Sequence, residues 1–286
     1  MKPMIKYRGG KTKELSALKR HFPRKFDRYI EPFLGGGAVF FDLEPNVAIV
    51  NDVNDKLMAF YFDVRNNFDR LKEELRELQN TYEHNQQDYA ALKKEHPDER
   101  VPNRNEDLYY ELREEYNHPT GRYLAGTLYY FINKTAYSGM IRFNAKGEYN
   151  VPFGRYANFN TELVTEGHKE LLQRTQIFNG DYEAVFAMAK PNDFIFLDPP
   201  YDCVFNDYGN IDHIGGFTEE DQIRLARAFR NLPCKALMVV AETPIIDQLY
   251  GDLIVDRYSK DYAVNIRNRF KNSATHVIIK NYREEL

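Results

Sequence analysis

The sequence predicts an α/β protein with an open, mostly parallel sheet and a polar, mostly helical region inserted into it. From residue 175 onward, short apolar runs alternate with segments of helical spacing, the pattern of parallel strands covered by helices. Two more apolar runs precede residue 55, so residues 52–175 interrupt the sheet after its second strand. A chain of 286 residues can hold one domain with a sizeable insertion.

The individual elements follow from apolar spacing and from punctuation by Gly and Pro. Strands are predicted at 28–33, 46–50, 176–178, 193–197, 234–241, 253–257 and 276–279. Helices are predicted to begin at residue 38 and to span 54–78, 123–132, 182–189, 218–231 and 244–250. Thr218-Glu-Glu-Asp221 has the spacing of a capping box and marks one helix start.

The insertion differs in composition from the sheet that it interrupts. Residues 80–118 are polar, acidic and broken by prolines, which predicts helices and loops outside the sheet. Residues 133–156 are polar, punctuated by glycines and in places alternating, which fits a hairpin or an ordered loop. We therefore expect a sheet domain of residues 1–55 and 165–286 and an inserted domain of residues 56–164.

The net charge of −4 conceals an uneven distribution. Residues 1–30 carry ten Lys/Arg and two Asp/Glu, and residues 257–283 carry seven Lys/Arg and one Asp. Residues 63–118 carry nine Lys/Arg and fifteen Asp/Glu. Basic ends around an acidic middle are compatible with ordinary solvated charge, and they also fit a basic face that neutralises phosphates.

Several classes of protein are disfavoured. No apolar run approaches the ~20 residues of a membrane span, and the basic N-terminal stretch lacks the apolar core of a signal peptide. Cys203 and Cys234 do not suggest a disulfide framework, and the seven histidines lack metal-ligand spacing. We expect a cytoplasmic protein with no zinc site and no membrane partner.

A glycine turn and a carboxylate stand where the first two strands end. Gly35-Gly36-Gly37 lets the backbone approach a ligand at a helix N-terminus, and Asp52 ends the next strand. An acidic residue after such a turn commonly holds the hydroxyls of a ribose. The full Gly-x-Gly-x-x-Gly spacing is absent, because Phe40 takes its last position. The pair thus fits an adenosine-type ligand, with tight packing as the alternative.

Residues 8–12 (Arg-Gly-Gly-Lys-Thr) resemble the end of a phosphate loop. The full motif needs a glycine at position 5, where Ile5 stands, and no apolar strand precedes the stretch. We reject a nucleoside triphosphatase on these grounds. What remains is a glycine pair that directs Lys11 toward another group.

The stretch Asp198-Pro-Pro-Tyr201 ends a buried strand abruptly. Two prolines cannot continue a central strand, and the residue before a proline is held extended, so Asp198 is directed rigidly at the carboxyl edge of the sheet. A carboxylate and a proline carbonyl can accept both hydrogens of an exocyclic amino group, and Tyr201 offers a flat face for a base. A simple strand cap and turn would need only one of the prolines.

Together these motifs resemble the Dam-like, D12 class of DNA adenine-N6 methyltransferases, in which Asp-Pro-Pro-Tyr is the catalytic motif. Their order is similar to that of the alpha group, and the resemblance covers nearly the whole chain. The other matching motifs are Tyr7-Arg-Gly-Gly-Lys11, Glu31-Pro-Phe-Leu-Gly-Gly-Gly37, Asn51-Asp-Val-Asn54, Asn133-Lys-Thr135, Tyr137-Ser-Gly-Met-Ile-Arg-Phe-Asn144, Gly147-Glu-Tyr-Asn-Val-Pro-Phe-Gly154 and Asn179-Gly-Asp181. The resemblance implies a Rossmann-like class I SAM-dependent methyltransferase sheet with an inserted target-recognition region and a β-hairpin.

The resemblance also implies roles for individual residues. S-adenosylmethionine would be bound by Tyr7, Lys11, Phe33, Gly35, Gly36, Gly37, Asp52, Asp181 and Asp198. The catalytic residues would be Asp198, Pro199, Pro200 and Tyr201. Double-stranded DNA would be contacted by Arg8, Lys134, Tyr137, Ser138, Met140, Arg142, Asn144, Pro152 and Arg155. Asp52 would hold the ribose hydroxyls and Asp181 the amino group of the cofactor adenine.

The implied reaction is in-line methyl transfer to N6 of an adenine flipped out of the duplex. Asp198 and the Pro199 carbonyl would orient the amine rather than act as a general base, and Tyr201 would stack on the base, which offsets the cost of flipping. Arg142 would read a guanine, or alternatively contact a phosphate. GATC is the expected target, although Tyr137-Ser-Gly-Met140 replaces the Tyr-Asn-Gly-Leu common among relatives, which more often have Trp where Tyr7 stands.

Two other classes stay open at this stage. The chain could methylate another amine, such as cytosine N4, RNA adenine or a glutamine amide, although such relatives tend to carry Ser or Asn at the position of Asp198. It could also be a non-catalytic DNA-binding or cofactor-sensing module. The loop 202–217 is either a mobile flap or an ordered surface loop. We expect a bacterial or phage-encoded enzyme that associates with the nucleoid through DNA, with a cognate restriction endonuclease as a potential partner.

Overall fold

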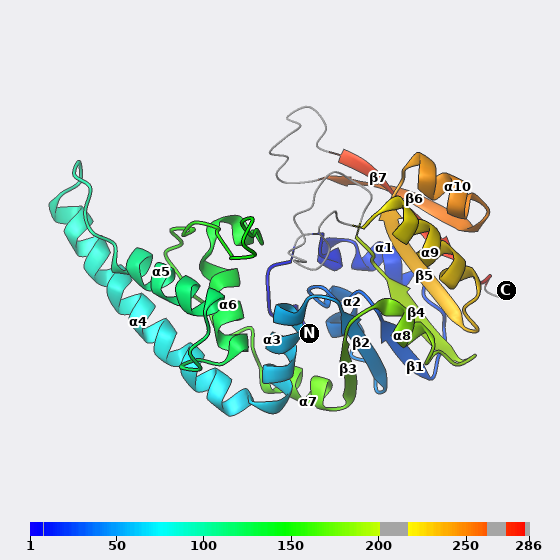
Figure 1. Ribbon diagram of the computed structural model, residues 1–286, viewed down its shortest axis with the longest axis horizontal. Coiled ribbons are helices and arrows are strands. Elements are labelled where there is room, and N and C mark those ends of the chain that lie inside the picture. Colours follow the sequence, from blue (N-terminus) through cyan, green and yellow to red (C-terminus); the bar gives the residue numbers. More distant parts are fainter. Residues whose placement is uncertain (8, 201–216, 262–272, 284–286) are drawn as a thin grey trace.

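The computed structural model describes residues 1–7, 9–200, 217–261 and 273–283. Seven strands form one sheet in the order β3-β2-β1-β4-β5-β7-β6 (Figure 1). Their bounds are β1 Arg28–Glu31, β2 Ala48–Asp52, β3 Thr175–Asn179, β4 Asp193–Leu197, β5 Lys235–Ala241, β6 Ile254–Asp261 and β7 Ser273–Lys280. The strands β1 to β5 are parallel, and β7 pairs antiparallel with β5 and β6. The predicted open, mostly parallel sheet is confirmed.

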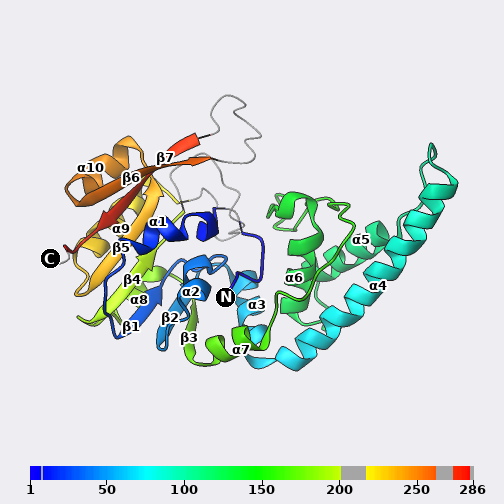
Figure 2. The same cartoon turned by 180° about the vertical axis from the view of Figure 1, so that it is seen from behind.

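Helices cover both faces of this sheet, because alternate strand residues point into two separate cores. Val50 and Phe196 face one core together with residues of α1, α2, α3 and α7, whereas Ile49 and Leu197 face the other with α8, α9 and α10. In Figure 1 α9 lies in front of the sheet, and in Figure 2 α1 does. The bounds are η1 Lys11–Lys13, α1 Leu15–Lys19, α2 Ala38–Leu43, α3 Asp55–Asn66, α7 Glu166–Gln173, α8 Tyr182–Phe186, α9 Glu219–Arg230, α10 Pro244–Tyr250 and η3 Gly251–Leu253. The predicted capping box at the start of α9 is present.

The segment between α3 and α7 forms a helical arm that extends away from the sheet (Figures 1 and 2). It contains α4 Phe68–Glu95, α5 Arg104–Asn117, α6 Ala125–Thr135 and η2 Tyr137–Gly139. The single helix predicted over 54–78 is instead two helices, because Asn67 has non-helical angles (φ −124°, ψ 28°) and its side-chain amide donates to Asp63 Oδ1. The apolar spacing continues across this break and hides it. No helix in the described ranges is long and apolar enough to cross a membrane.

Polar contacts hold α6 of the arm against α3, α4 and the N-terminal segment. At its N-terminal end, Gly126 N donates to Asp63 Oδ2 (2.8 Å) and Thr127 Oγ1 donates to Glu74 Oε2 (2.6 Å). At the other end, the Asn133 side chain exchanges two hydrogen bonds with the backbone of Lys6, at 2.9 and 2.7 Å. These contacts tie the arm to the segment that leads into the site.

The expected hairpin at 133–156 follows an antiparallel course but does not form regular strands. Its first three residues belong to α6, and the remainder is an ordered loop, which we call the 136–156 loop. Two isolated bridges join its arms, Ala136 with Phe153 and Phe143 with Tyr149. Buried Tyr149 and Phe153 anchor the loop by packing against the aromatic side chains of α5.

Candidate active site

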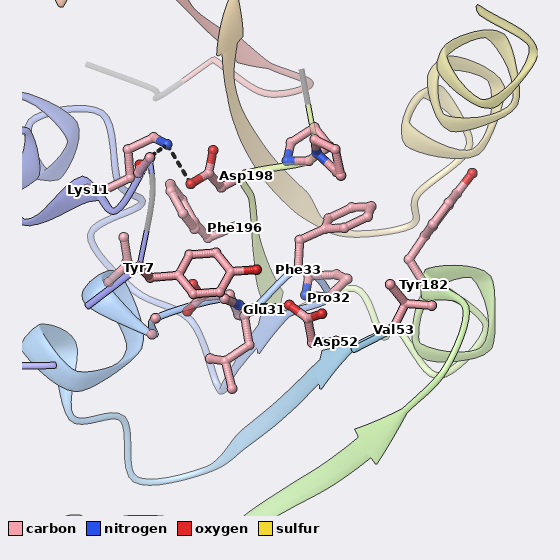
Figure 3. A pocket seen from close by; sticks show the side chains of 18 of the residues that line it. Tyr7, Lys11, Glu31, Pro32, Phe33, Asp52, Val53, Tyr182, Phe196 and Asp198 are labelled. Atoms are coloured by element: carbon pink, nitrogen blue, oxygen red, sulfur yellow. Dashed lines mark hydrogen bonds and ion pairs between the residues drawn. The ribbon is translucent and has the colours of Figure 1, made fainter. Parts of the chain in front are cut away.

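One cavity opens at the carboxyl ends of β1, β2 and β4 (Figure 3). It brings together all nine residues predicted to bind the cofactor: Tyr7, Lys11, Phe33, Gly35, Gly36, Gly37, Asp52, Asp181 and Asp198. Pro199 and Pro200 of the predicted catalytic set also line it, while Tyr201 and the loop residues 202–216 lie outside the described part of the chain. The topology explains this convergence, since the carboxyl ends of neighbouring parallel strands meet at one edge.

The strand order sets three carboxyl groups along this edge. Asp52 ends β2, Glu31 ends β1, and Asp198 directly follows β4. Because β1 pairs with both β2 and β4, Glu31 lies between the other two carboxyl groups.

The Asp198 carboxylate forms an ion pair with Lys11 inside the cavity. Lys11 Nζ lies 2.5 Å from Asp198 Oδ2 and also donates to the Gly9 carbonyl at 2.9 Å (Figure 3). The Lys11 side chain is only 2% exposed. Burial lowers the pKa of Lys11, and the attraction of Asp198 counters that effect. The group toward which the glycine pair directs Lys11 is therefore the carboxylate of the Asp-Pro-Pro motif, a contact that the sequence did not reveal.

The glycine turn packs tightly under Tyr7. Gly35 has a left-handed conformation (φ +49°), and a Cβ atom there would lie 2.7 Å from the Tyr7 ring. Gly35 N donates to Asp52 Oδ2 (2.8 Å), and Tyr61 OH donates to the Gly35 carbonyl (2.8 Å). Tight packing, which was the alternative explanation of the glycines, is thus present, and it leaves the turn as one wall of the cavity.

Asp52 is held rigidly with its carboxylate toward the cavity. Its two oxygens each accept one backbone hydrogen bond, from Gly35 N and from Asn54 N at 3.0 Å. A carboxylate has about four lone-pair positions, so further donors can still be accepted on both oxygens. Burial raises the pKa of Asp52, and the backbone hydrogen bonds counter that effect.

An apolar, aromatic wall lies at the other end of the cavity. Phe33 and Tyr182 have ring centroids 5.3 Å apart, and Val53 lies on the same side in Figure 3. Asp181 caps α8 by accepting from Glu183 N (2.9 Å) and forms an ion pair with Arg224 (2.9 Å). The Arg224 guanidinium in turn lies over the Tyr182 ring. The cavity is also lined by Val53, Tyr182 and Arg224, which the sequence did not predict. Tyr182 and Arg224 belong to none of the motifs, so nothing in the sequence singled them out.

Glu31 is another residue for which sequence reasoning assigned no role. Its carboxyl group is buried and accepts a hydrogen bond from Tyr29 OH (2.7 Å). Burial raises the pKa of Glu31 to about 8. Because Glu31 ends an apolar strand, the sequence could have suggested that its carboxyl group is buried. It could not have shown that the pKa of Glu31 is raised.

The residues predicted to contact DNA lie apart from the cavity, mostly in the 136–156 loop, and Arg8 is outside the described residues. Tyr137 is 55% exposed at the base of the loop, where its backbone N–H donates to the Pro152 carbonyl. Arg142 donates to the Asn150 side chain (2.8 Å), and the Asn144 side chain organises the turn that it begins by accepting from Lys146 N and Glu148 N. Of the remaining predicted residues, Lys134 lies in the last turn of α6, and Ser138 and Arg155 have positive φ angles. The Met140 carbonyl accepts from Tyr149 OH, and the Pro152 carbonyl accepts from Tyr137 N.

A sheet with a ligand cavity at its carboxyl edge and an Asp-Pro-Pro turn inside it defines a methyltransferase of the type that modifies exocyclic amines. The sequence model of the D12 class N6 adenine-specific DNA methyltransferases matches residues 7–266. The chain is 33% identical to the Type II methyltransferase M.CviBI of Paramecium bursaria Chlorella virus NC1A, over 99% of this chain and 100% of the relative. It is 31% identical to the Type II methyltransferase M.MjaIII of Methanocaldococcus jannaschii, over 99% of each. The DNA adenine methylase of Escherichia coli strain K12 is 30% identical over 80% of this chain and 75% of that protein.

The chain belongs to the D12 class of N6 adenine-specific DNA methyltransferases, and its activity is the methylation of adenine in DNA. The resemblance inferred from the motifs is therefore confirmed. Of the alternatives that the motifs left open, the family, which is specific for adenine in DNA, decides against cytosine N4.

Proposed function

We propose that the protein transfers a methyl group from S-adenosylmethionine to N6 of a flipped-out adenine in double-stranded DNA, within a GATC-like site. The observation that carries this proposal is the order of groups along the cavity: the Phe33–Tyr182 aromatic wall and Asp52 at one end, the glycine turn in the middle, and Asp198 at the other end. This order matches the order of adenine, ribose, sulfonium and methyl acceptor in the reacting pair.

The residues in the cavity fit S-adenosylmethionine chemically. The Phe33–Tyr182 wall offers an apolar, aromatic face to the adenine ring, and Asp181 beside it accepts hydrogen bonds. The two Asp52 oxygens suit the two ribose hydroxyls, because each already holds one backbone donor and can take another. Tyr7 and the glycine turn would enclose the methionine part. When bound, the cofactor supplies an electrophilic methyl group on a positively charged sulfur.

In this proposal the chain's own residues orient the nucleophile. The Asp198 carboxylate and the Pro199 carbonyl accept hydrogen bonds from the adenine amino group and turn its lone pair toward the methyl. Lys11 holds the carboxylate at a fixed angle. Gln222, which is fully buried on α9, donates to the Pro200 carbonyl at 3.4 Å and steadies the proline turn.

We further assign residues 56–164 to target recognition and residues 1–55 and 165–286 to catalysis. Support for the division comes from the arm, which extends from one side of the sheet, and from the exposed Tyr137 near the start of the 136–156 loop. Tyr137 would fill the gap that the flipped base leaves, and Arg142 would read a guanine. A companion endonuclease would have to cut the same site.

The test is methyl transfer from labelled S-adenosylmethionine to unmethylated DNA and to RNA, followed by nucleoside analysis and sequencing of the modified positions. We expect N6-methyladenine in DNA at a single short sequence. Asp198→Ala is the control, and it should abolish transfer while leaving the melting temperature within a few degrees. Full activity of Asp198→Ala would refute the assigned mechanism, and methylation at a site other than GATC would correct the target alone.

A further inference from the structure

Glu31 is a buried acid in the cavity whose function the proposed reaction does not explain. Its side chain is 2% exposed, lines the cavity and accepts from Tyr29 OH at 2.7 Å. Burial is the main cause that raises the pKa of Glu31 to about 8, and the nearby charge of Asp198 adds to it. At neutral pH the group is therefore a neutral carboxylic acid in the protein without ligands.

The position of Glu31 places it on the path of any ligand that spans the cavity. Glu31 ends β1, which lies between the strand that carries Asp52 and the strand that leads to Asp198. A molecule that reaches from Asp52 to Asp198 must cross the end of β1. Under the proposed function, which this inference requires, the sulfonium lies between the ribose and the methyl acceptor, and so beside Glu31.

The groups around Glu31 leave it without a dedicated counter-ion. Tyr29 on the same strand and Tyr61 on α3 stay neutral, because burial raises both pKa values. Phe40 N on α2 contributes a backbone hydrogen bond. Among these described neighbours the cation is Lys11 on η1, whose ammonium lies 2.5 Å from Asp198 and is balanced there. An additional positive charge in the cavity would thus act strongly on Glu31.

We propose that Glu31 is the residue that distinguishes the sulfonium of the methyl donor from the neutral thioether of its product. It is a neutral acid in the free enzyme, loses its proton to solvent when the sulfonium binds, and faces that charge as a carboxylate. After transfer the sulfur is a neutral thioether, and Glu31 takes up one proton while the methylated nitrogen gives one up. At the transfer step, proton uptake and proton loss therefore cancel. Over the whole cycle one proton is released to solvent, and its release occurs when the donor binds.

This exchange would favour product release. The spent cofactor, S-adenosylhomocysteine, has no sulfonium and would meet a neutral acid, so it gains no ion-pair energy. Because donor binding is linked to loss of one proton, the affinity for S-adenosylmethionine should rise about tenfold per pH unit between pH 6 and 8. The affinity for S-adenosylhomocysteine should stay flat over the same range.

The experiment is calorimetric titration of the full-length protein with each ligand at pH 7, in phosphate and in Tris buffer. The two buffers differ in ionisation enthalpy, so the difference in heat counts the protons released. We expect about one proton per S-adenosylmethionine and none for S-adenosylhomocysteine. Dissociation constants at pH 6, 7 and 8 provide an independent measure of the same linkage.

Three variants assign the proton to its residue. Glu31→Gln should release no proton and should lose at least tenfold in preference for the donor over the product at pH 8. Tyr29→Phe keeps the carboxyl group and removes a hydrogen bond that lowers the pKa of Glu31, so the pH range of the linkage should shift upward. Glu162→Gln, at an exposed position, is the matched control and should behave as the wild type.

Equal proton release with both ligands would overturn the inference, since it would mean that a group common to both ligands acts on the protein. Unchanged release in Glu31→Gln would overturn it as well. If Glu31→Gln does not fold, Tyr29→Phe and the two-ligand comparison on wild type still decide the question. If neither ligand binds, the proposed function itself fails, a result distinct from binding without differential proton release.

Discussion

The cavity and the 136–156 loop hold their polar side chains in opposite ways. In the cavity, the contacts join residues far apart in the chain, such as Lys11 with Asp198 and Gly35 with Asp52, and the Lys11 and Asp52 side chains are buried. Around the loop residues predicted to contact DNA, the contacts are local and exposed: Arg142 binds Asn150, and Ser138 N donates to Tyr156 OH.

This difference separates the chemistry from the reading of DNA. Contacts that several elements hold in place keep the reacting groups pre-organised, and a change in one of them disturbs all substrates alike. Exposed loop residues whose contacts are with each other can be substituted without disturbing the sheet. Variants that break a cavity contact should therefore lower the rate of methylation. Variants that break a loop contact should change which DNA site is chosen.

The largest effect is expected from Lys11→Met, which removes the cation that holds Asp198. The carboxylate loses its fixed direction, so kcat should fall by about a hundredfold or more on every DNA site. Single-turnover methylation rates measure this. Lys11→Arg retains a positive charge and should recover part of the rate, and a Lys11→Met enzyme with wild-type turnover would contradict a positioning role.

A smaller and more selective effect is expected from Arg142→Ala in the loop. If Arg142 reads a base, discrimination at one position should fall by about 1–3 kcal/mol, with the other positions unchanged. Binding across a set of single-base variants of the site measures this. Asn150→Ala retains Arg142 but removes its partner, so it should weaken the same position less. Uniform weakening at all sites, with a reduced salt dependence, would show a phosphate contact instead.

The sequence predicted the cavity better than the loop, and the contacts explain why. Glycines, prolines and carboxylates at strand ends report on backbone geometry, which is local, so Gly35, Asp52 and Asp198 could be placed at one sheet edge. The Lys11–Asp198 pair joins residues 187 positions apart, and nothing in either stretch indicates it. Arg224 and Tyr182 belong to no motif, and the break at Asn67 is hidden by continuous apolar spacing.

The pH dependence of stability shows whether burying the Glu31 carboxyl group in the cavity lowers the free energy of unfolding. Its pKa of about 8 means that the folded chain retains a proton that the unfolded chain loses above its ordinary pKa of 4.5. The free energy of unfolding should therefore fall as pH rises from about 5 to 8, by up to about 1.4 kcal/mol per unit.

Glu31→Gln should remove this contribution, so the difference in unfolding free energy between variant and wild type should rise across that range. Urea unfolding at pH 5, 6, 7 and 8 measures it. His276, whose pKa burial lowers to about 3, contributes equally to both proteins and cancels in the difference. A difference that does not change with pH would mean that Glu31 is ionised in the folded protein.

The smallest effect is expected at the rim of the cavity, where the polar contacts are exposed as they are in the loop. Arg224 lines the cavity, but its ion pair with Asp181 is exposed on both sides (38% and 47%), and such pairs contribute about 0–1 kcal/mol. Arg224→Met should therefore weaken S-adenosylmethionine binding only a few-fold, and the loss should shrink further at high salt. Lys11→Met at the same salt concentrations provides the contrast, because a buried pair is screened much less. A large, salt-independent loss of affinity in Arg224→Met would show that Arg224 must orient Asp181 for the cofactor to bind. The rim of the cavity would then be as pre-organised as its buried part.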